Sequence, residues 1–522
     1  MRRLELLGKI GWDNTKGVVA TEGSAANAQT RRQVIEWMKE DSLDVTVDRI
    51  GNIIGILKPA TSDTNTSPII IASHIDTVPT GGIFDGRFGV LAGLETVRHL
   101  KQLAKDKKLT LTRPVIVASW SGEEGSYFQP SMPGSRATVN PGDTDKILDE
   151  CKSIEPGREG TTMRKALAEI AAAGTSMPGF FLKDDTLHET IYIEFHIEQA
   201  KELDNAQESL GVVTGIYGVS QSQITITANS QASNVVNAVA ALTCTINDRV
   251  KNDPVERGTV GSIETKNVQA ITKPALKIIF CGEGDHAGGR PMPGRRDAAY
   301  AAATFLERMA DDGIAENLVV IDGAANIIPA KAIVTISAPE GAEIDLWKER
   351  LQKHLQDIDI ERSVCSEIEE VFISENITEA KLTTDKRHIE TSYIEEAERV
   401  LEAAINTIAE KYNVTITQTQ GTREIPVHFD KTLIELMKNC AESNPHIAKP
   451  NGSVRTMLSG AFHDAMNFGR IMPSVMGFVP SVNGISHNKA EFTREEDLHA
   501  GVEVLTSMVV VILAKAGPIS LG

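Results

Sequence analysis

Buried strands and amphipathic helices alternate along the first part of the chain. Continuous apolar runs at 67–76 and 113–125 are typical of strands that are covered on both faces. Residues 29–41 and 88–103 space their apolar side chains as helices do, and 45–57 is β-branched with a central Gly/Asn turn, which predicts a hairpin. This alternation predicts an α/β sheet with helices on both faces.

The middle of the chain follows a different pattern. A strand-like ITITA segment and a Ser/Asn/Thr-rich stretch occupy 214–275, and a long alanine-rich helix is expected at 295–312. Residues 340–412 are charged, and their acidic clusters, SEIEEVF and YIEEAERV, favour solvated helix faces. After 424 the chain returns to a helix and to a buried strand at 471–481.

These patterns predict two domains, and the sequence shows no internal repeat. The first, an α/β domain, consists of residues 1–213 and 424–522, and the second, residues 214–423, interrupts it. Polar groups at the ends of the buried strands are well placed to build a site at one edge of the sheet.

Composition excludes several classes of protein. Among 522 residues, Lys plus Arg number 53 and Asp plus Glu 71, so the formal charge is −18, which argues against nucleic-acid and anionic-membrane partners. The 41% of hydrophobic and 24% of charged residues are ordinary globular values. No apolar run reaches the roughly 18–20 residues of a membrane helix. A poor signal peptide and five scattered cysteines predict a cytoplasmic protein.

The segment 73–89 has the residue types of a metal site. His74 and Asp76 lie two apart at a strand end, so their side chains point the same way, and Asp85 follows in a glycine-rich loop. Imidazole with carboxylate suits zinc, manganese or cobalt. Asp76 is either a ligand or a residue that orients His74, and an ordinary loop histidine is the alternative for the whole segment.

Two adjacent carboxylates extend this chemistry. Glu123 and Glu124 follow a buried strand directly, and such a pair is costly unless a cation neutralises one of them. One can then bind metal while the other takes a proton from metal-bound water. Together with His196 and His487, these residues could hold two metals that share Asp85.

The sequence resembles the amidase/hydantoinase/carbamoylase branch of the di-zinc aminoacylase/carboxypeptidase superfamily. That branch includes N-carbamoyl-L-amino-acid hydrolases, β-ureidopropionases and allantoate amidohydrolases. The matching stretches are SHIDTVPTGGIFDGRFGVLAGLE, SGEEGSYFQPSMPGSRA, EFHIEQAKELD, DHAGGRPMPGRRDAA, ANIIPA, SGAFHDA and GFVPSVNGISHNKAEFT. They run in family order over nearly the whole chain, and HIEQ, GSRA and GISH favour this branch over peptidases and aminoacylases.

The resemblance implies a fold and a metal centre. The fold is a di-metal catalytic α/β domain with a mixed sheet of the phosphorylase/hydrolase type, plus an inserted α+β lid and dimerisation domain. Two divalent ions per subunit (zinc, or manganese or cobalt) are expected. Their implied ligands, with Asp85 bridging, are His74, Asp85, Glu124, His196 and His487.

The resemblance also implies catalytic and substrate-binding residues. Glu123 matches the general acid/base and Asp76 the acid that orients His74. His286 matches a histidine that reaches the partner's site in a homodimer and stabilises the oxyanion. The implied substrate contacts are Gln199, His286, Asn326, Gly460 and His463.

The chain departs from the family pattern at one anion-binding position. Relatives that bind an amino-acid carboxylate carry an Asp-x-Arg at a strand end, where Thr335 and Ser337 stand here. Arg290 occupies a position where a small hydroxyl residue is usual. Either Arg290 replaces the anion clamp, or the substrate lacks the α-carboxylate. Extra segments near 221–275 and 340–390 either enlarge the interface or reshape the substrate entrance.

The predicted activity is hydrolysis of a linear C–N amide bond in a small molecule, most simply the carbamoyl or ureido group of an N-carbamoyl amino acid. One alternative is an aminoacylase or dipeptidase of the same superfamily, and another is a hydrolase for an amide without the α-carboxylate. A catalytically silent binding protein is disfavoured because all five candidate ligands and Glu123 are present.

Overall fold

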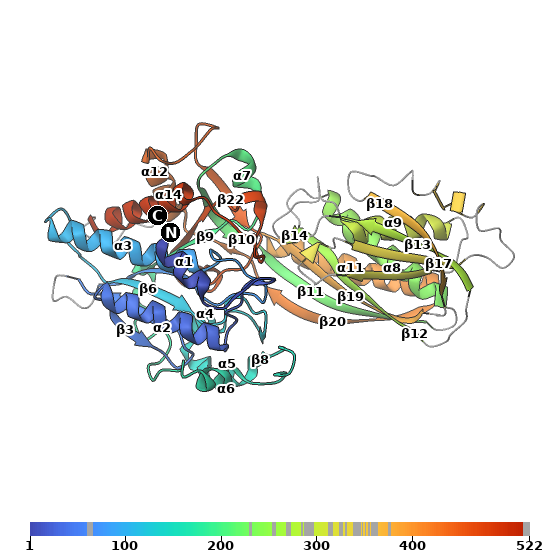
Figure 1. Cartoon of the computed structure of the whole chain (residues 1–522), viewed down its shortest axis with the longest axis horizontal. Helices are drawn as coiled ribbons and strands as arrows, with labels where there is room; N and C mark the ends of the chain where they lie inside the picture. Colours follow the sequence, from blue (N-terminus) through green and yellow to red (C-terminus); the bar gives the residue numbers. More distant parts are fainter. Residues whose placement is uncertain are drawn as a thin grey trace. The chain divides into compact units, whose positions relative to one another are not determined.

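The chain divides into two compact units. Unit 1 consists of Met1–Ile216 and Val427–Gly522, and unit 2 of Tyr217–Pro426 (Figure 1). The computed structural model describes residues 1–59, 66–228, 232–252, 257–267, 273–282, 285–286, 297–311, 317–322, 327–328, 331–337, 346, 348–349, 351–352, 355, 364–373 and 377–514.

Unit 1 is built on a nine-stranded mixed sheet. The order along it is β21-β10-β23-β9-β5-β6-β4-β3, and β22 pairs with β10. The strands are β3 Asp44–Val47, β4 Ile53–Leu57, β5 Ile69–His74, β6 Val115–Trp120, β9 Ile191–Ile197, β10 Gly211–Ile216, β21 Val427–His428, β22 Arg455–Ser459 and β23 Ser474–Val479. Strands β6, β5, β9 and β23 run parallel, and every residue of these four strands is buried.

Helices and small hairpins complete unit 1. The helices are α1 Arg2–Lys9, α2 Ala25–Glu40, α3 Arg87–Lys105, α4 Pro133–Val139, α5 Thr144–Glu150, α6 Met163–Glu169, α7 Glu202–Ala206, α12 Lys431–Ser443, α13 Ala465–Phe468 and α14 Glu495–Ala514, with 3₁₀ turns η1 Pro141–Asp143, η2 Asp184–Glu189 and η3 Val482–Gly484. The short strands β1 Trp12–Asp13 and β2 Gly17–Val18 pair with each other, as do β7 Phe128–Gln129 and β8 Lys152–Ser153. The predicted α/β fold class is confirmed.

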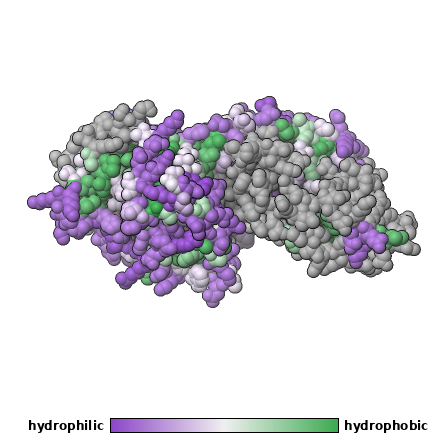
Figure 2. All heavy atoms as spheres, turned by 90° about the horizontal axis from the view of Figure 1, so that it is seen from above, coloured by the Kyte–Doolittle hydropathy of each residue, from purple (hydrophilic) through white to green (hydrophobic). Residues whose placement is uncertain are grey.

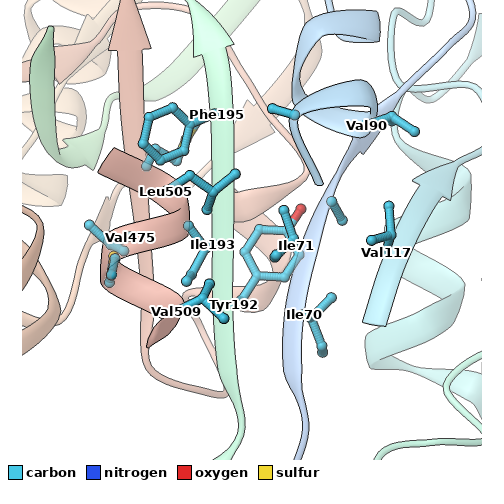
Figure 3. Packing of buried hydrophobic residues seen from close by; sticks show 14 of the residues in the cluster. Ile70, Ile71, Val90, Val117, Tyr192, Ile193, Phe195, Val475, Leu505 and Val509 are labelled. Carbon is cyan, nitrogen blue, oxygen red and sulfur yellow. The ribbon is translucent and has the colours of Figure 1, made fainter. Parts of the chain in front are cut away.

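The core of unit 1 lies between the central strands and two long helices. Figure 3 shows Ile71, Val117 and Ile193 of the sheet beside Val90 of α3 and Leu505 of α14, and all five are buried. This packing explains why their strands are apolar at every position: neither face of the sheet meets water.

Helix α14 differs from the sequence expectation. Among the described residues it is the one helix long and apolar enough to cross a membrane, although 56% of that stretch is buried inside the protein. Leu498, Val504 and Met508 lie in the core of unit 1, as expected for the core helix of a globular domain. On the face drawn in Figure 2, most described residues are hydrophilic and the hydrophobic ones form separate patches. The absence of a membrane partner stays a prediction.

Unit 2 contains an eight-stranded antiparallel sheet. Its order is β18-β13-β17-β15-β12-β19-β11-β20. The strands are β11 Gly218–Ala228, β12 Arg257–Asn267, β13 Lys273–Cys281, β15 Asn317–Asp322, β17 Lys331–Ser337, β18 Val364–Ile373, β19 Ile377–His388 and β20 Val414–Glu424, and β14 Asp285–His286 pairs separately with β16 Ile327–Ile328. Helices α8 Ala232–Asn252, α9 Ala298–Asp311 and α11 Thr391–Tyr412 share one hydrophobic core with the sheet.

One expectation about this unit is wrong, and one feature of it is not visible in the sequence. The acidic cluster SEIEEVF lies in strand β18 rather than on a helix, because pairing with β13 outweighs the weak local signal. An internal repeat exists as well. Read outward from the central β12–β15 pair, each half of the sheet has its second, third, first and fourth strand in that order. The two halves have no evident sequence similarity, so the repeat shows only in the strand pairing.

Candidate metal centre

The ends of three neighbouring parallel strands bring the first polar groups together. His74 is the last residue of β5, His196 lies near the end of β9, and Glu123 and Glu124 follow β6. Because β5 lies between β9 and β6, these groups meet at one edge of the sheet. Asp85 reaches the same edge from the loop before α3.

The first group of candidate ligands is fully buried. Asp85 Oδ1 lies 3.1 Å from His196 Nε2 and 3.4 Å from His74 Nε2, and the two Nε2 atoms are 3.5 Å apart. The other ring nitrogen of His196 lies 2.9 Å from the carbonyl oxygen of Ile197. That bond, made by Nδ1–H, leaves Nε2 as the acceptor nitrogen, which takes the backbone N–H of Gly86 at 3.1 Å and is the atom that could bind a metal.

The second group shares Asp85 with the first. His487 Nε2 lies 3.4 Å from Asp85 Oδ2 and 3.4 Å from Glu124 Oε2. In each group the potential ligand atoms lie within 4.8 Å of one another, and Asp85 offers one oxygen to each. The geometry thus fits two cations bridged by one carboxylate.

Unpaired buried groups support a cation here. Glu124 Oε1 is buried and has no hydrogen-bond partner among the described residues. Burial raises the pKa of Glu124 to about 7, against the opposing effect of His487. Burial also acts to raise the pKa of Asp85, but His196, His487 and His74 hold it well below its usual range. A divalent ion would compensate these buried charges.

Asp76 lies behind the first group. Its Oδ1 is 3.6 Å from His74 Nδ1, the nitrogen that faces away from Asp85, and its backbone oxygen is 3.2 Å from the same atom. Its carboxylate also accepts hydrogen bonds from the backbone N–H groups of Glu123 (3.4 Å) and Glu124 (3.3 Å). Of the two predicted alternatives for Asp76, this geometry favours orientation of His74.

Glu123 differs from its neighbour in position and charge. Its Oε2 lies 3.6 Å from His74 Nε2, and the residue belongs to neither ligand group. Burial raises its pKa well above the usual range, although His74 opposes the shift. A buried carboxyl group that can hold a proton beside a metal site has the properties of a general acid/base.

Gln199 and His463 adjoin the ligands. Gln199 Nε2 donates to Asp85 Oδ2 at 2.7 Å and lies 3.2 Å from His487 Nε2. Gln199 and His487 both have positive φ angles, 58° and 54°, a backbone conformation that is uncommon for non-glycine residues. The ring of His463 packs against His196, with centroids 4.5 Å apart, and Gly460 follows β22.

Glu491 is a residue of the site that was not expected from the sequence. Its Oε1 accepts hydrogen bonds from the backbone N–H groups of Phe84 (2.9 Å) and Asp85 (3.1 Å). Ser486 bridges the two acids, since its hydroxyl lies 3.0 Å from Asp85 Oδ2 and 3.4 Å from Glu491 Oε2. The available signal was a carboxylate in NKAEFT, directly after His487.

The remaining predicted residues belong to unit 2. The backbone of His286 pairs with Ile327 in the β14–β16 ladder, whereas Arg290 and Asn326 lie outside the described residues. Thr335 and Ser337 lie in β17. An Asp-x-Arg does exist, on β19: Arg387 donates to Asp385 through Nε at 2.8 Å and Nη2 at 3.0 Å, and both are buried. The letters DKRH before a helix were the overlooked signal.

Comparisons with known proteins agree on one family. The family described as Peptidase family M20/M25/M40 matches residues 70–510. The chain is 26% identical over 513 residues to an N-carbamoyl-L-amino acid amidohydrolase of Geobacillus stearothermophilus, with 97% of this chain and 95% of the relative covered. It is 25% identical over 517 residues to an allantoate amidohydrolase of Escherichia coli (strain K12), with the same coverage.

Solved structures show the same fold. A hydantoinase/carbamoylase family amidase from Burkholderia ambifaria superposes with a TM-score of 0.60 at 25% identity, covering 99% of this chain and 97% of that chain. A related amidase from Burkholderia multivorans has a TM-score of 0.62 at 24% identity, covering 98% and 97%. The predicted family resemblance is confirmed.

Proposed function

We infer that this chain, which belongs to peptidase family M20/M25/M40, is a metal-dependent amidohydrolase that cleaves the C–N bond of a carbamoyl or ureido group in a small molecule. The observation that carries this proposal is the pair of ligand groups that share Asp85, with Glu123 beside them and outside both. The relatives are named as amidohydrolases of N-carbamoyl-L-amino acids and of allantoate, and these names agree with the predicted reaction class.

We assign two divalent ions to the two ligand groups. His74, Asp85 and His196 would hold one ion, and Asp85, Glu124 and His487 the other. Zinc, manganese and cobalt all suit this set of nitrogen and oxygen donors. When bound, such ions supply a water of lowered pKa and polarise the substrate oxygen.

The residues of the chain then move the protons. Glu123 takes a proton from the attacking water and returns it to the leaving nitrogen. Asp76 keeps the His74 ring oriented, and Glu491 holds the loop that carries Asp85. With a carbamoyl substrate, water addition and C–N cleavage release ammonia, carbon dioxide and the free amine.

Both units supply substrate contacts in this proposal. The resemblance implies a lid and dimerisation domain, with His286 stabilising the oxyanion and Asn326 contacting the substrate in a homodimer. We assign stabilisation of the oxyanion to His286 in either case, whether this residue comes from the same chain or from a partner. Gln199, Gly460 and His463 complete the proposed contacts, and Arg290 is a candidate anion ligand. A cytoplasmic location belongs to the same proposal.

Ammonia release from a matched substrate panel tests this function. The metal-reconstituted protein would be given N-carbamoyl-α-amino acids, N-carbamoyl-β-alanine and allantoate, beside ureido compounds that lack a carboxylate. We expect release from a carboxylate substrate, its loss on chelation, and recovery when metal is added back. If the metal-loaded protein releases ammonia from none of these compounds, the proposal fails.

A second candidate substrate class follows from Ser337. If only compounds without a carboxylate are hydrolysed, the serine at this position marks a change of substrate. If carboxylate substrates are preferred, Arg290 or Arg387 supplies the cation that Ser337 cannot.

A further inference from the structure

The sheet of unit 2 consists of two copies of one βαββαβ motif. The outer repeat, residues 218–267 and 377–424, contains β11, α8, β12, β19, α11 and β20. The inner repeat, residues 273–373, contains β13, α9, β15, β17 and β18. The described residues 348–349 and 351–352, between β17 and β18, are helical. Both repeats therefore have a helix after the first strand, α8 and α9 (Figure 1), and described helical residues after the third.

The two repeats also share their strand order. Each has its second, third, first and fourth strand side by side, and all neighbours are antiparallel. The inner repeat lies in the chain between the second and third strands of the outer repeat. In a single βαββαβ motif these two strands are antiparallel neighbours and need only a short connection. Such connections accept whole inserted domains.

The repeats join through equivalent elements. Second strand pairs with second strand: β12 lies antiparallel to β15, with Ile263 opposite Ile321. The helices after the first strands, α8 and α9, also contact each other. Pairing of equivalent elements is the pattern of a two-fold symmetric dimer interface, here within one chain. Without the inner repeat, β12 would be an exposed edge able to pair with another molecule.

The two repeats carry different candidate functional side chains. The inner repeat carries His286 after its first strand, whereas residues 218–267 of the outer repeat contain no histidine at all. The outer repeat carries Asp385 and Arg387 on its third strand. In the inner repeat Thr335 and Ser337 occupy the equivalent places.

Strand register supports this equivalence. Arg387 pairs with Val219 and Ser337 with Ala275, each near the start of the first strand of its repeat. In the sequence of unit 2, the inner repeat therefore supplies His286 and the outer repeat supplies the one Asp-x-Arg of this unit, Asp385 and Arg387. In a homodimer, each subunit could supply these side chains to the other. Such a dimer would need neither a second repeat within each chain nor a difference in sequence between the repeats.

We propose that the inner repeat takes the place of a second subunit, so that the protein works as a monomer and its activity needs no His286 from another chain. The role given to His286 rests on the proposed function, whereas the monomeric state rests on the sheet alone. This inference replaces the homodimer that the family resemblance implies.

Sedimentation of the full-length, metal-loaded protein tests whether it is a monomer. We expect a mass near 56.5 kDa throughout a dilution series, with specific activity independent of concentration. A mass of twice that value under assay conditions would overturn the inference. A monomer that hydrolyses none of the test compounds would overturn the proposed function and still support the account of the sheet.

Complementation between two inactive variants tests whether activity needs His286 from another chain. His286→Ala and Glu123→Gln would be co-expressed with different tags and purified together and apart. If His286 acts across an interface, the mixture regains activity, because a chain with intact Glu123 receives His286 from its partner. We expect the mixture to show only the summed activity of the variants, and recovery would overturn the proposal. The sedimentation of each variant verifies that it remains folded.

Discussion

Glu123 and Glu124 show how neighbouring residues with the same side chain acquire different tasks. Glu124 faces His487 within a ligand group, whereas Glu123 faces His74 and lies outside both groups. Both residues lie in the turn after β6, and because their carboxylates face different partners, one can bind metal while the other handles protons.

This difference predicts the outcome of one substitution. Glu123→Gln should lower kcat by roughly 10²–10⁴-fold, since an amide cannot accept the proton of the attacking water. Bound metal, measured by elemental analysis, should stay at the wild-type level. Glu124→Gln is the matched control and should lose metal as well as activity. Full activity of metal-loaded Glu123→Gln would show that another group is the base.

At the scale of elements, the start of α3 is built around His74. Gly86, which precedes the helix, has a φ of 63°, and a Cβ there would lie 2.3 Å from both Cε1 and Nε2 of His74. A glycine is needed because the backbone passes directly beside the imidazole. The helix thus begins where the ligand loop ends.

We therefore expect Gly86→Ala to displace His74 and to weaken metal binding at least tenfold, a loss of about 1.4 kcal/mol. Competition with a chromogenic chelator would measure the affinity. Gly142→Ala is a suitable control because a Cβ at this position would have no other atom within 4 Å and because its φ is not positive. Unchanged affinity in Gly86→Ala would mean that His74 does not bind metal as proposed.

At the scale of the whole molecule, the two units have separate cores. One cluster of buried hydrophobic residues spans the mixed sheet of unit 1, and another spans the repeated sheet of unit 2. All candidate metal ligands belong to unit 1.

Calorimetry should accordingly resolve two unfolding transitions, only one of which depends on metal. A metal present at one hundred times its dissociation constant stabilises the state that binds it by about 2.7 kcal/mol. Chelation should therefore lower the unfolding temperature of unit 1 and leave that of unit 2 unchanged. An equal shift of both transitions would indicate that the units unfold as one cooperative body.

Much of the candidate site could be predicted from local sequence. His74, Asp85, Glu123 and Glu124 stand at or shortly after the ends of apolar runs, and a run that must be a buried strand places its last polar residues at the sheet edge. Glu491 was missed because a lone acid in a loop has no local signature, and its task depends on the backbone of Phe84 and Asp85.

The strands of unit 2 were the harder part. Residues 366–372 alternate too weakly and are too acidic to reveal a strand. Asp385 and Arg387 were overlooked because they lie on β19, far along the chain from the segment 332–340 where the Asp-x-Arg was expected. Propensity is a weak guide where pairing between distant strands decides the conformation.

By itself, the sequence determined the family, the α/β class and the residue types of a metal centre, because these depend on apolar periodicity and on short motifs that survive divergence. Only the tertiary structure decided that Glu491 meets the backbone of Phe84 and Asp85, and that two dissimilar segments form one repeated sheet. The physical reason is the same in both cases. Strand order and side-chain convergence arise from contacts between residues distant in the chain, and no local pattern records which distant partner is chosen.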